Sequence, residues 1–304
     1  MFAQLGRPGK AAQLYVPKSE LEILGQEILE DKALYRIRAR QRVHYLTCDI
    51  IFDEMTMCRP CLLIPELPPF PDTDWTRMRI RHSRTQTMEY EITNEPLSQV
   101  RDIWHHRHID VLSLKRISSY NARVKEVEFE GRTAISKTAH LDEWIPSIEH
   151  ETRVYRAIAE LGSHDVSHLA PVFLGHLTEQ GRPVGFLLEK IEGRAASLSE
   201  LPMCKLALSR LHDMGILHGD VHRHNFIIER TTGRVRVIDF EHAEPLQDDE
   251  KARLEMEEMQ NSLTEENIIE RARGTSVLMV DGVESEPCTK PIPYLKFSGK
   301  ATVA

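Results

Sequence analysis

Three polar side chains between residues 220 and 239 have the types and spacing that phosphoryl transfer needs. Asp220 and Asn225 lie five residues apart, and Asp239 lies near the end of a short hydrophobic segment, residues 235–240. In such an arrangement one carboxylate orients a hydroxyl nucleophile, while an amide oxygen and a second carboxylate hold Mg²⁺ on nucleotide phosphates. Asp and Asn also cap loops and turns, which is the alternative role for each residue alone. Their joint spacing favours the chemical role.

The segments around these residues resemble two loops of the protein-kinase-like superfamily. Residues 218–225 read His-Gly-Asp-Val-His-Arg-His-Asn and residues 239–241 read Asp-Phe-Glu, similar to the H-x-D-x-x-x-x-N and D-F-x motifs. The resemblance implies that Asp220, His222 and Asn225 are catalytic residues, and that Asn225 and Asp239 hold the metal. It also implies that ATP and Mg²⁺ are the cofactors.

The same resemblance implies three further contacts to the nucleotide. Lys137, in Ala-Ile-Ser-Lys, is similar to the lysine of the third kinase strand, and Glu151 is its expected partner on the following helix. Such a pair fixes the ammonium against the α- and β-phosphates. Glu149 is the competing glutamate. Residues 187–193 resemble the hinge between lobes, so the backbone of Glu189 and Ile191 is expected to bind adenine.

Several departures from the protein-kinase pattern narrow the resemblance. Gly219 replaces the usual arginine, Glu241 replaces the glycine of D-F-G, and no Ala-Pro-Glu follows. The H-G-D and D-F-E forms are similar to those of aminoglycoside and choline phosphotransferases. Over about residues 100–265 the chain resembles most closely a group of fungal kinase-fold proteins that are sometimes labelled alpha-galactosidase A. Glycoside cleavage needs two carboxylates flanking a sugar, and the sequence indicates no such pair outside the kinase-like motifs, so it does not support that label.

Two features of the phosphate region weaken the expectation of catalysis. The loop at residues 118–122 has no glycine, whereas a glycine-rich loop lets backbone N–H groups approach the phosphates. His222 occupies the position of a phosphate-contacting lysine, so activity is expected to fall as its imidazole deprotonates above about pH 6.5. A nucleotide-binding scaffold without catalysis therefore remains an alternative, and nucleotidyl transfer is a further one.

The elements that must position these residues divide the chain into four parts. Residues 1–108 are expected to form an accessory region with a helix over 19–45 and a proline-rich connector over 60–71. Residues 109–193 predict a kinase-like N-lobe of five strands and one helix, and 194–274 a reduced helical C-lobe. Residues 275–304 are expected to be a loosely ordered tail. The fold class is therefore α+β, a bilobal kinase-like fold.

Charge patterns in two segments predict solvent-exposed faces. The alternating arginines at 36, 38, 40 and 42 are expected to face water, with anion binding as the alternative. The charged segment 247–273 has the spacing of a surface helix, with Glu255 and Glu257 on its solvated face. A docking surface for a protein partner is the alternative role of this acidic helix.

Composition excludes several classes of partner. The 304 residues carry 39 Lys and Arg against 47 Asp and Glu, a net charge of −8, which argues against binding to nucleic acid or to anionic membranes. No apolar run approaches the roughly 20 residues of a membrane span. Five scattered cysteines are expected to be reduced. We expect a cytoplasmic phosphotransferase that binds ATP and a small-molecule acceptor.

Overall fold

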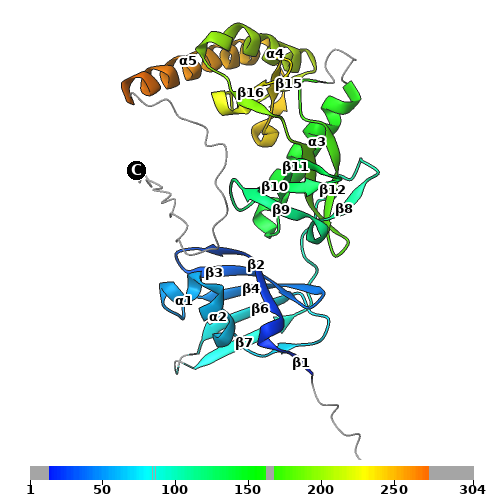
Figure 1. The fold of residues 1–304 in the computed structure, drawn as a ribbon, viewed down its shortest axis with the longest axis vertical. Helices are drawn as coiled ribbons and strands as arrows, with labels where there is room; N and C mark the ends of the chain where they lie inside the picture. Colours follow the sequence, from blue (N-terminus) through cyan, green and yellow to red (C-terminus); the bar gives the residue numbers. More distant parts are fainter. Residues whose placement is uncertain (1–13, 84, 86, 162–167, 274–304) are drawn as a thin grey trace, which may run out of the picture.

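The computed structural model describes residues 14–83, 85, 87–161 and 168–273, and for residues 265–273 it describes the backbone only. The described chain is arranged as three successive units, an N-terminal unit, an N-lobe and a C-lobe (Figure 1). The predicted tail at 275–304 lies outside the described residues. Among the described helices, none combines the length and hydropathy that crossing a membrane requires.

The N-terminal unit is built on a five-stranded sheet with two short helices beside it (Figure 1). The strand order is β2-β3-β4-β6-β7, and β1 pairs with β5 at one side. The bounds are β1 (Tyr15–Val16), β2 (Leu21–Ile28), β3 (Lys32–Ala39), β4 (Arg42–Asp49), α1 (Glu54–Cys58), α2 (Pro60–Glu66), β5 (Phe70–Pro71), β6 (Arg77–His82) and β7 (Met88–Thr93).

The prediction of a helix over residues 19–45 is wrong, because this segment forms β2, β3 and β4. In β3 the buried residues Ala33, Tyr35, Ile37 and Ala39 alternate with less buried ones, which is the period of a strand. The segment predicted as a proline-rich connector also contains regular structure. Pro60 begins α2, where a missing N–H costs nothing.

The N-lobe is a six-stranded sheet with one long helix. Its strand order is β8-β12-β13-β11-β10-β9, so the five predicted strands are present and a sixth, β8, pairs in parallel with β12. The bounds are β8 (His108–Asp110), β9 (Lys115–Ser119), β10 (Val124–Phe129), β11 (Arg132–Thr138), α3 (Ile145–Leu161), β12 (Phe173–Glu179) and β13 (Arg182–Glu189).

The C-lobe consists of two helices and short strand pairs. One apolar core continues from the N-lobe into this lobe, from Tyr155 and Phe186 to Leu208, Phe240 and Met259. The bounds are β14 (Gly193–Ala195), α4 (Leu201–Asp213), β15 (Ile216–Leu217), β16 (Phe226–Glu229), β17 (Val235–Val237), β18 (Glu244–Pro245) and α5 (Asp249–Arg273). The predicted α+β, two-lobed kinase-like architecture is confirmed.

A buried ionic cluster joins the N-terminal unit to the N-lobe. Glu179, at the end of β12, is 2% exposed and accepts hydrogen bonds from Arg36 and Tyr45 of the N-terminal sheet. Arg182 adds a contact at 3.1 Å between its Nη2 and Glu179 Oε2. Arg36 is itself buried, so the prediction that the arginine run faces water is wrong at this position, because the N-lobe covers it.

Candidate active site

Lys137 lies at the centre of a cluster of three carboxylates between the lobes. Its Nζ is 2.6 Å from Glu151 Oε2 on α3 and 2.6 Å from Asp239 Oδ1 after β17. A third carboxylate, Glu241 Oε2, lies at 3.2 Å. Burial alone would lower the pKa of Lys137, but the charges of Glu151 and Asp239 outweigh it and raise the pKa, so the ammonium is retained. The structure thus brings together three residues that are distant in sequence.

The partner of Lys137 is Glu151 and not Glu149. Glu151 is 1% exposed, and its Oε1 also accepts the backbone N–H of Phe240 at 3.3 Å. Burial raises its pKa to about 7, against the opposing effect of the Lys137 charge. Glu149 instead contacts Arg153 at 2.7 Å and accepts from the backbone of Arg101. α3 therefore links the lysine to the segment that follows Asp239.

Asp220 and Asn225 form a second polar group, on the loop between β15 and β16. Asn225 Nδ2 donates to the backbone oxygen of Asp220 at 2.9 Å and to its Oδ2 at 3.1 Å. His222 Nε2 lies 3.3 Å from the same Oδ2. Within the described part of the chain, the amide oxygen of Asn225 and Oδ1 of Asp220 make no hydrogen bond. The side chain of Asp220 is 38% exposed.

Backbone bonds place this loop against the segment of Asp239. Ile238 N donates to Asn225 O at 2.9 Å, and His218 Nε2 bonds to Ile238 O at 3.0 Å. Asp239 itself has a left-handed backbone, with φ at 64°, which is uncommon for a residue other than glycine. Strain of this kind concentrates at functional positions. This backbone conformation directs the half-exposed carboxylate of Asp239 toward Lys137.

Glycine at position 219 is required by the geometry of the loop. Its φ is +76°, and a Cβ atom there would lie 2.1 Å from the backbone oxygen of His242. An arginine, as protein kinases have at this position, would therefore collide with the segment after Asp239. The departure from the protein-kinase motif thus has a local steric cause.

Glu255 of α5 contacts the loop that carries Gly219 and Asp220, and the sequence did not indicate this role. Its Oε1 accepts the backbone N–H of Gly219 at 2.6 Å, and its Oε2 lies 2.6 Å from His212 Nε2. Glu255 is 6% exposed, so the prediction that it lies on a solvated face is wrong. Met259 and Leu263 are buried on the same helix, at i+4 and i+8. This spacing of four residues was the signal that this side of the helix packs against the C-lobe.

A second pair that the sequence did not indicate lies beside the cluster. Arg123, immediately before β10, makes two hydrogen bonds to Glu241, at 3.0 and 3.1 Å. Ser147 Oγ donates to the same carboxylate at 2.7 Å. Partial burial opposes ionisation of Glu241, but Arg123, Ser147 and Lys137 outweigh it and lower its pKa to about 2. Glu241 is therefore a fixed anion in the cluster.

The donor set suits a magnesium ion. Carboxylate oxygens of Glu151, Asp239 and Glu241 lie within 4.8 Å of one another, and hard oxygen atoms are the ligands that Mg²⁺ prefers. Glu151 is committed to Lys137, so Asp239 is the most available of the three. Asn225 is joined to Ile238, the residue before Asp239, by a backbone hydrogen bond of 2.9 Å.

The two predicted hinge residues differ in their backbone surroundings. Glu189 is paired with Ala134 at the end of β13, and its N–H donates to Val172 O at 3.0 Å. Ile191 follows β13, and within the described part of the chain no loop hydrogen bond involves its backbone. Ile191 therefore has both backbone groups available, as a hinge residue needs.

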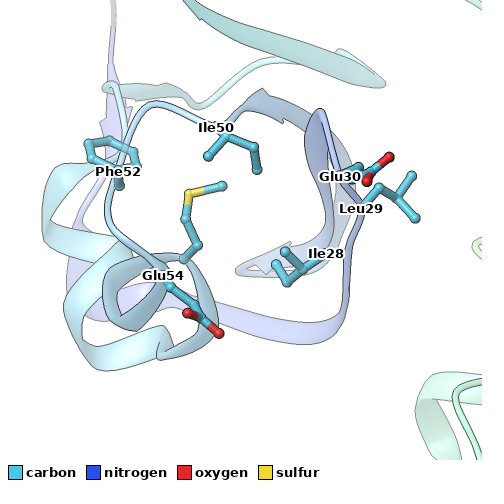
Figure 2. A pocket seen from close by; sticks show the side chains of 7 residues that line it. Ile28, Leu29, Glu30, Ile50, Phe52 and Glu54 are labelled. Atoms are coloured by element: carbon cyan, nitrogen blue, oxygen red, sulfur yellow. The ribbon is translucent and has the colours of Figure 1, made fainter. Parts of the chain in front are cut away.

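An open pocket lies outside this cluster, in the N-terminal unit (Figure 2). Its volume is about 210 Å³, and it is lined by Ile28, Leu29, Glu30, Ile50, Phe52, Glu54 and Met57. None of the predicted site residues lines it. Its lining is apolar except for the carboxylates of Glu30 and Glu54.

One family model matches part of the C-lobe. The family described as "Lipopolysaccharide core biosynthesis protein (WaaY)" matches residues 199–270, from near the start of α4 through most of α5. The matched segment contains Asp220, Asn225 and Asp239, and it covers less than half of the chain.

The remaining comparisons add a similar structure but no curated relative. The crystal structure of the BubR1 kinase domain is similar with a TM-score of 0.36 and 17% identity, covering 51% of this chain. The alignment spans 55% of the BubR1 kinase domain chain, about half its length. No curated protein matches the sequence.

Proposed function

We propose that this chain is an ATP- and Mg²⁺-dependent phosphotransferase that acts on a hydroxyl group of a small molecule. The observation that carries the proposal is the position of Lys137, whose ammonium lies 2.6 Å from both Glu151 and Asp239. Beside it, backbone bonds join the Asp239 segment to the loop of Asp220 and Asn225. This juxtaposition supplies a phosphate-binding cation, metal ligands and a proton acceptor in one place.

Each residue takes a role that its contacts allow. Lys137, fixed by Glu151, orients the α- and β-phosphates, and Asp239 with Asn225 holds Mg²⁺. Bound Mg²⁺ neutralises charge on the transferring phosphoryl group. The exposed oxygen of Asp220 accepts the proton of the acceptor hydroxyl as the hydroxyl oxygen attacks the γ-phosphorus of ATP. The bond between the γ-phosphorus and the β–γ bridging oxygen breaks, and ADP leaves. Positioning and charge stabilisation supply most of the acceleration.

Two other predicted residues have supporting roles in this proposal. The imidazole of His222 contacts both Asp220 and Asn225, and in its protonated form it adds positive charge where phosphate charge develops. Adenine binds to the carbonyl group of Glu189 and to the backbone of Ile191. The position of both residues at the end of β13, between the lobes, supports that assignment.

Two features favour the alternative of a nucleotide-binding scaffold. Glu241 places a third carboxylate 3.2 Å from the Lys137 ammonium, and the loop at residues 118–122 has no glycine to approach phosphate. Both features weaken the binding of a polyphosphate until Glu241 is displaced or a metal ion screens its charge. The scaffold would bind ATP without transferring phosphate.

The test measures binding and product together. Wild-type protein and Asp220→Asn are incubated with Mg²⁺ and ATP labelled at the γ-phosphate, and with hydroxyl acceptors that include choline, an aminoglycoside and a lipopolysaccharide core sugar, which the matched family suggests. Transfer or hydrolysis of the γ-phosphate by the wild type alone supports the proposal. Mass spectrometry of the acceptor distinguishes added phosphate from added AMP. ATP binding without either product supports the scaffold.

A further inference from the structure

We propose that Arg123 is a ligand of the nucleotide phosphates and that its bond to Glu241 is the resting contact that phosphate displaces. The inference rests on the proposed function and adds a residue that the kinase resemblance does not supply. In this chain a guanidinium takes over part of the role that backbone N–H groups of a glycine-rich loop have elsewhere.

The position of Arg123 in the sheet places it next to Lys137. It lies between β9 and β10, at the end of the glycine-free loop, and the adjacent residue Val124 pairs with Lys137. The backbone oxygen of Arg123 accepts the N–H of Thr138 at 3.0 Å. The loop that would cover phosphate therefore carries its cation directly beside the lysine strand.

The side chain of Arg123 is arranged to bind a planar anion. Its two terminal nitrogens bind the two oxygens of Glu241 at 3.0 and 3.1 Å, and its guanidinium carbon lies 4.4 Å from the centre of the Trp144 ring. The same fork geometry matches two oxygens of a phosphate. The side chain is 23% exposed, so a ligand can reach it from the solvent side.

Two cations share one carboxylate at this point, which marks an anion-binding position. Glu241 Oε1 binds Arg123, while Glu241 Oε2 lies 3.2 Å from Lys137. A nucleotide phosphate carries more negative charge than a carboxylate and competes for both cations. Ser147 continues to hold Glu241 through a bond of 2.7 Å when Arg123 exchanges its partner.

The test compares ligands that differ only in their phosphates. Isothermal titration measures the affinity of Mg·ATP, Mg·ADP and adenosine for wild type, Arg123→Ala and Arg123→Lys. Arg116→Ala serves as the control, because Arg116 is an exposed arginine on the same hairpin. We expect Arg123→Ala to weaken Mg·ATP binding by about 10- to 100-fold and to change adenosine binding by less than about twofold. Arg123→Lys keeps the positive charge but lacks the forked guanidinium, so we expect its Mg·ATP affinity to lie between those of the wild type and Arg123→Ala.

Each other outcome has a distinct meaning. Equal or tighter Mg·ATP binding by Arg123→Ala, with the wild type binding normally, overturns the inference and leaves the proposed function intact; the contact is then structural or inhibitory. An equal loss for adenosine also overturns it, since the loss then reflects general disorder. If Arg123→Ala does not fold, Arg123→Lys decides, and wild-type affinity in that variant rejects the inference. Absence of Mg·ATP binding by the wild type rejects both proposals.

Discussion

The N-terminal unit and the two kinase-like lobes use their charged residues in different ways. In the N-terminal unit and its interface, the buried charge of Glu179 is matched by Arg36 and Arg182, and the cluster is closed to water. In the cleft between the lobes, Lys137 faces three carboxylates, and one of them, Asp239, is 46% exposed. The first cluster has two arginines around one carboxylate and is closed. The second has three carboxylates around Lys137 and Arg123, and it has an opening.

This contrast separates structural from chemical ion pairs. Buried charges are costly unless they are paired, so a closed cluster contributes structure and offers nothing to a ligand. An excess of carboxylates around one cation favours further cations, such as Arg123 beside Glu241, and it would also favour a bound metal ion. The apolar cores follow the same division, since the N-terminal unit has its own core and the two lobes share another.

The largest expected effect is the loss of turnover in Asp220→Asn. The amide cannot accept the acceptor proton, so the rate of phosphate transfer falls by about 10²- to 10⁴-fold. The hydrogen bond to Asn225 has a counterpart in the amide, so Mg·ATP affinity and thermal stability change little. Steady-state kinetics and calorimetry on one preparation check both parts. Parallel loss of binding and turnover would contradict the assigned role.

Glu179→Gln tests the closed cluster. The substitution leaves the charges of Arg36 and Arg182 buried without a carboxylate, and the free energy of unfolding falls by about 3–5 kcal/mol. The control is Glu22→Gln, which removes an exposed partner of Arg38 and costs less than about 1 kcal/mol. Urea unfolding monitored by tryptophan fluorescence compares the two. Equal effects would show that burial does not distinguish these pairs.

Two matched core substitutions test whether the site depends on one core only. Ile80→Ala in the N-terminal unit and Ile148→Ala on α3 each remove a fully buried side chain, at a cost of about 2–5 kcal/mol. Only Ile148→Ala disturbs the helix that carries Glu151, so only this variant is expected to lose Mg·ATP affinity. Calorimetry at a temperature where both variants are folded checks this. A similar loss in Ile80→Ala would contradict the division.

The smallest expected effect is a pH dependence caused by Glu241. Its pKa is lowered to about 2 from the ordinary 4.5, so its ionised form stabilises the fold above about pH 4.5. This stability is lost as the pH falls toward 2, because the carboxylate becomes protonated. We expect the difference in free energy of unfolding between wild type and Glu241→Gln, on the order of 1 kcal/mol, to shrink across that window, as measured by thermal unfolding. A difference that stays constant would show that Glu241 is not ionised in the fold.

The sequence predicted much of the site because the informative residues form local motifs. The spacing of Asp220 and Asn225 lies within one loop, and the resemblance named Lys137 and Glu151, which the structure places in contact. Arg123 belongs to no motif and lies 118 residues from Glu241, so their pairing depends on the folded sheet. The burial of Glu255 was missed because the prediction followed its charge and not the spacing of the buried residues on the same helix.

The N-terminal fold was predicted less well because two periodicities overlap. Leu21, Leu24, Ile28 and Leu29 have helical spacing, but Gly25 and the turn at residues 30–31 interrupt it. From residue 35 to residue 40 the apolar side chains alternate with arginines, which was the stronger signal for a strand. Arg36 occupies a polar position of that alternation but is buried, and its partner Glu179 lies 143 residues away.

The most direct test of the account is the effect of Lys137→Met on Mg·ATP binding. Lys115→Met is the control, because Lys115 is exposed on β9 and lies outside the site. We expect the wild type and the control to bind ATP when Mg²⁺ is present and to lose it in EDTA, while Lys137→Met binds at least about tenfold more weakly. Undiminished affinity in Lys137→Met, or no magnesium-dependent binding by the wild type, would contradict the claim that this cluster holds a nucleotide.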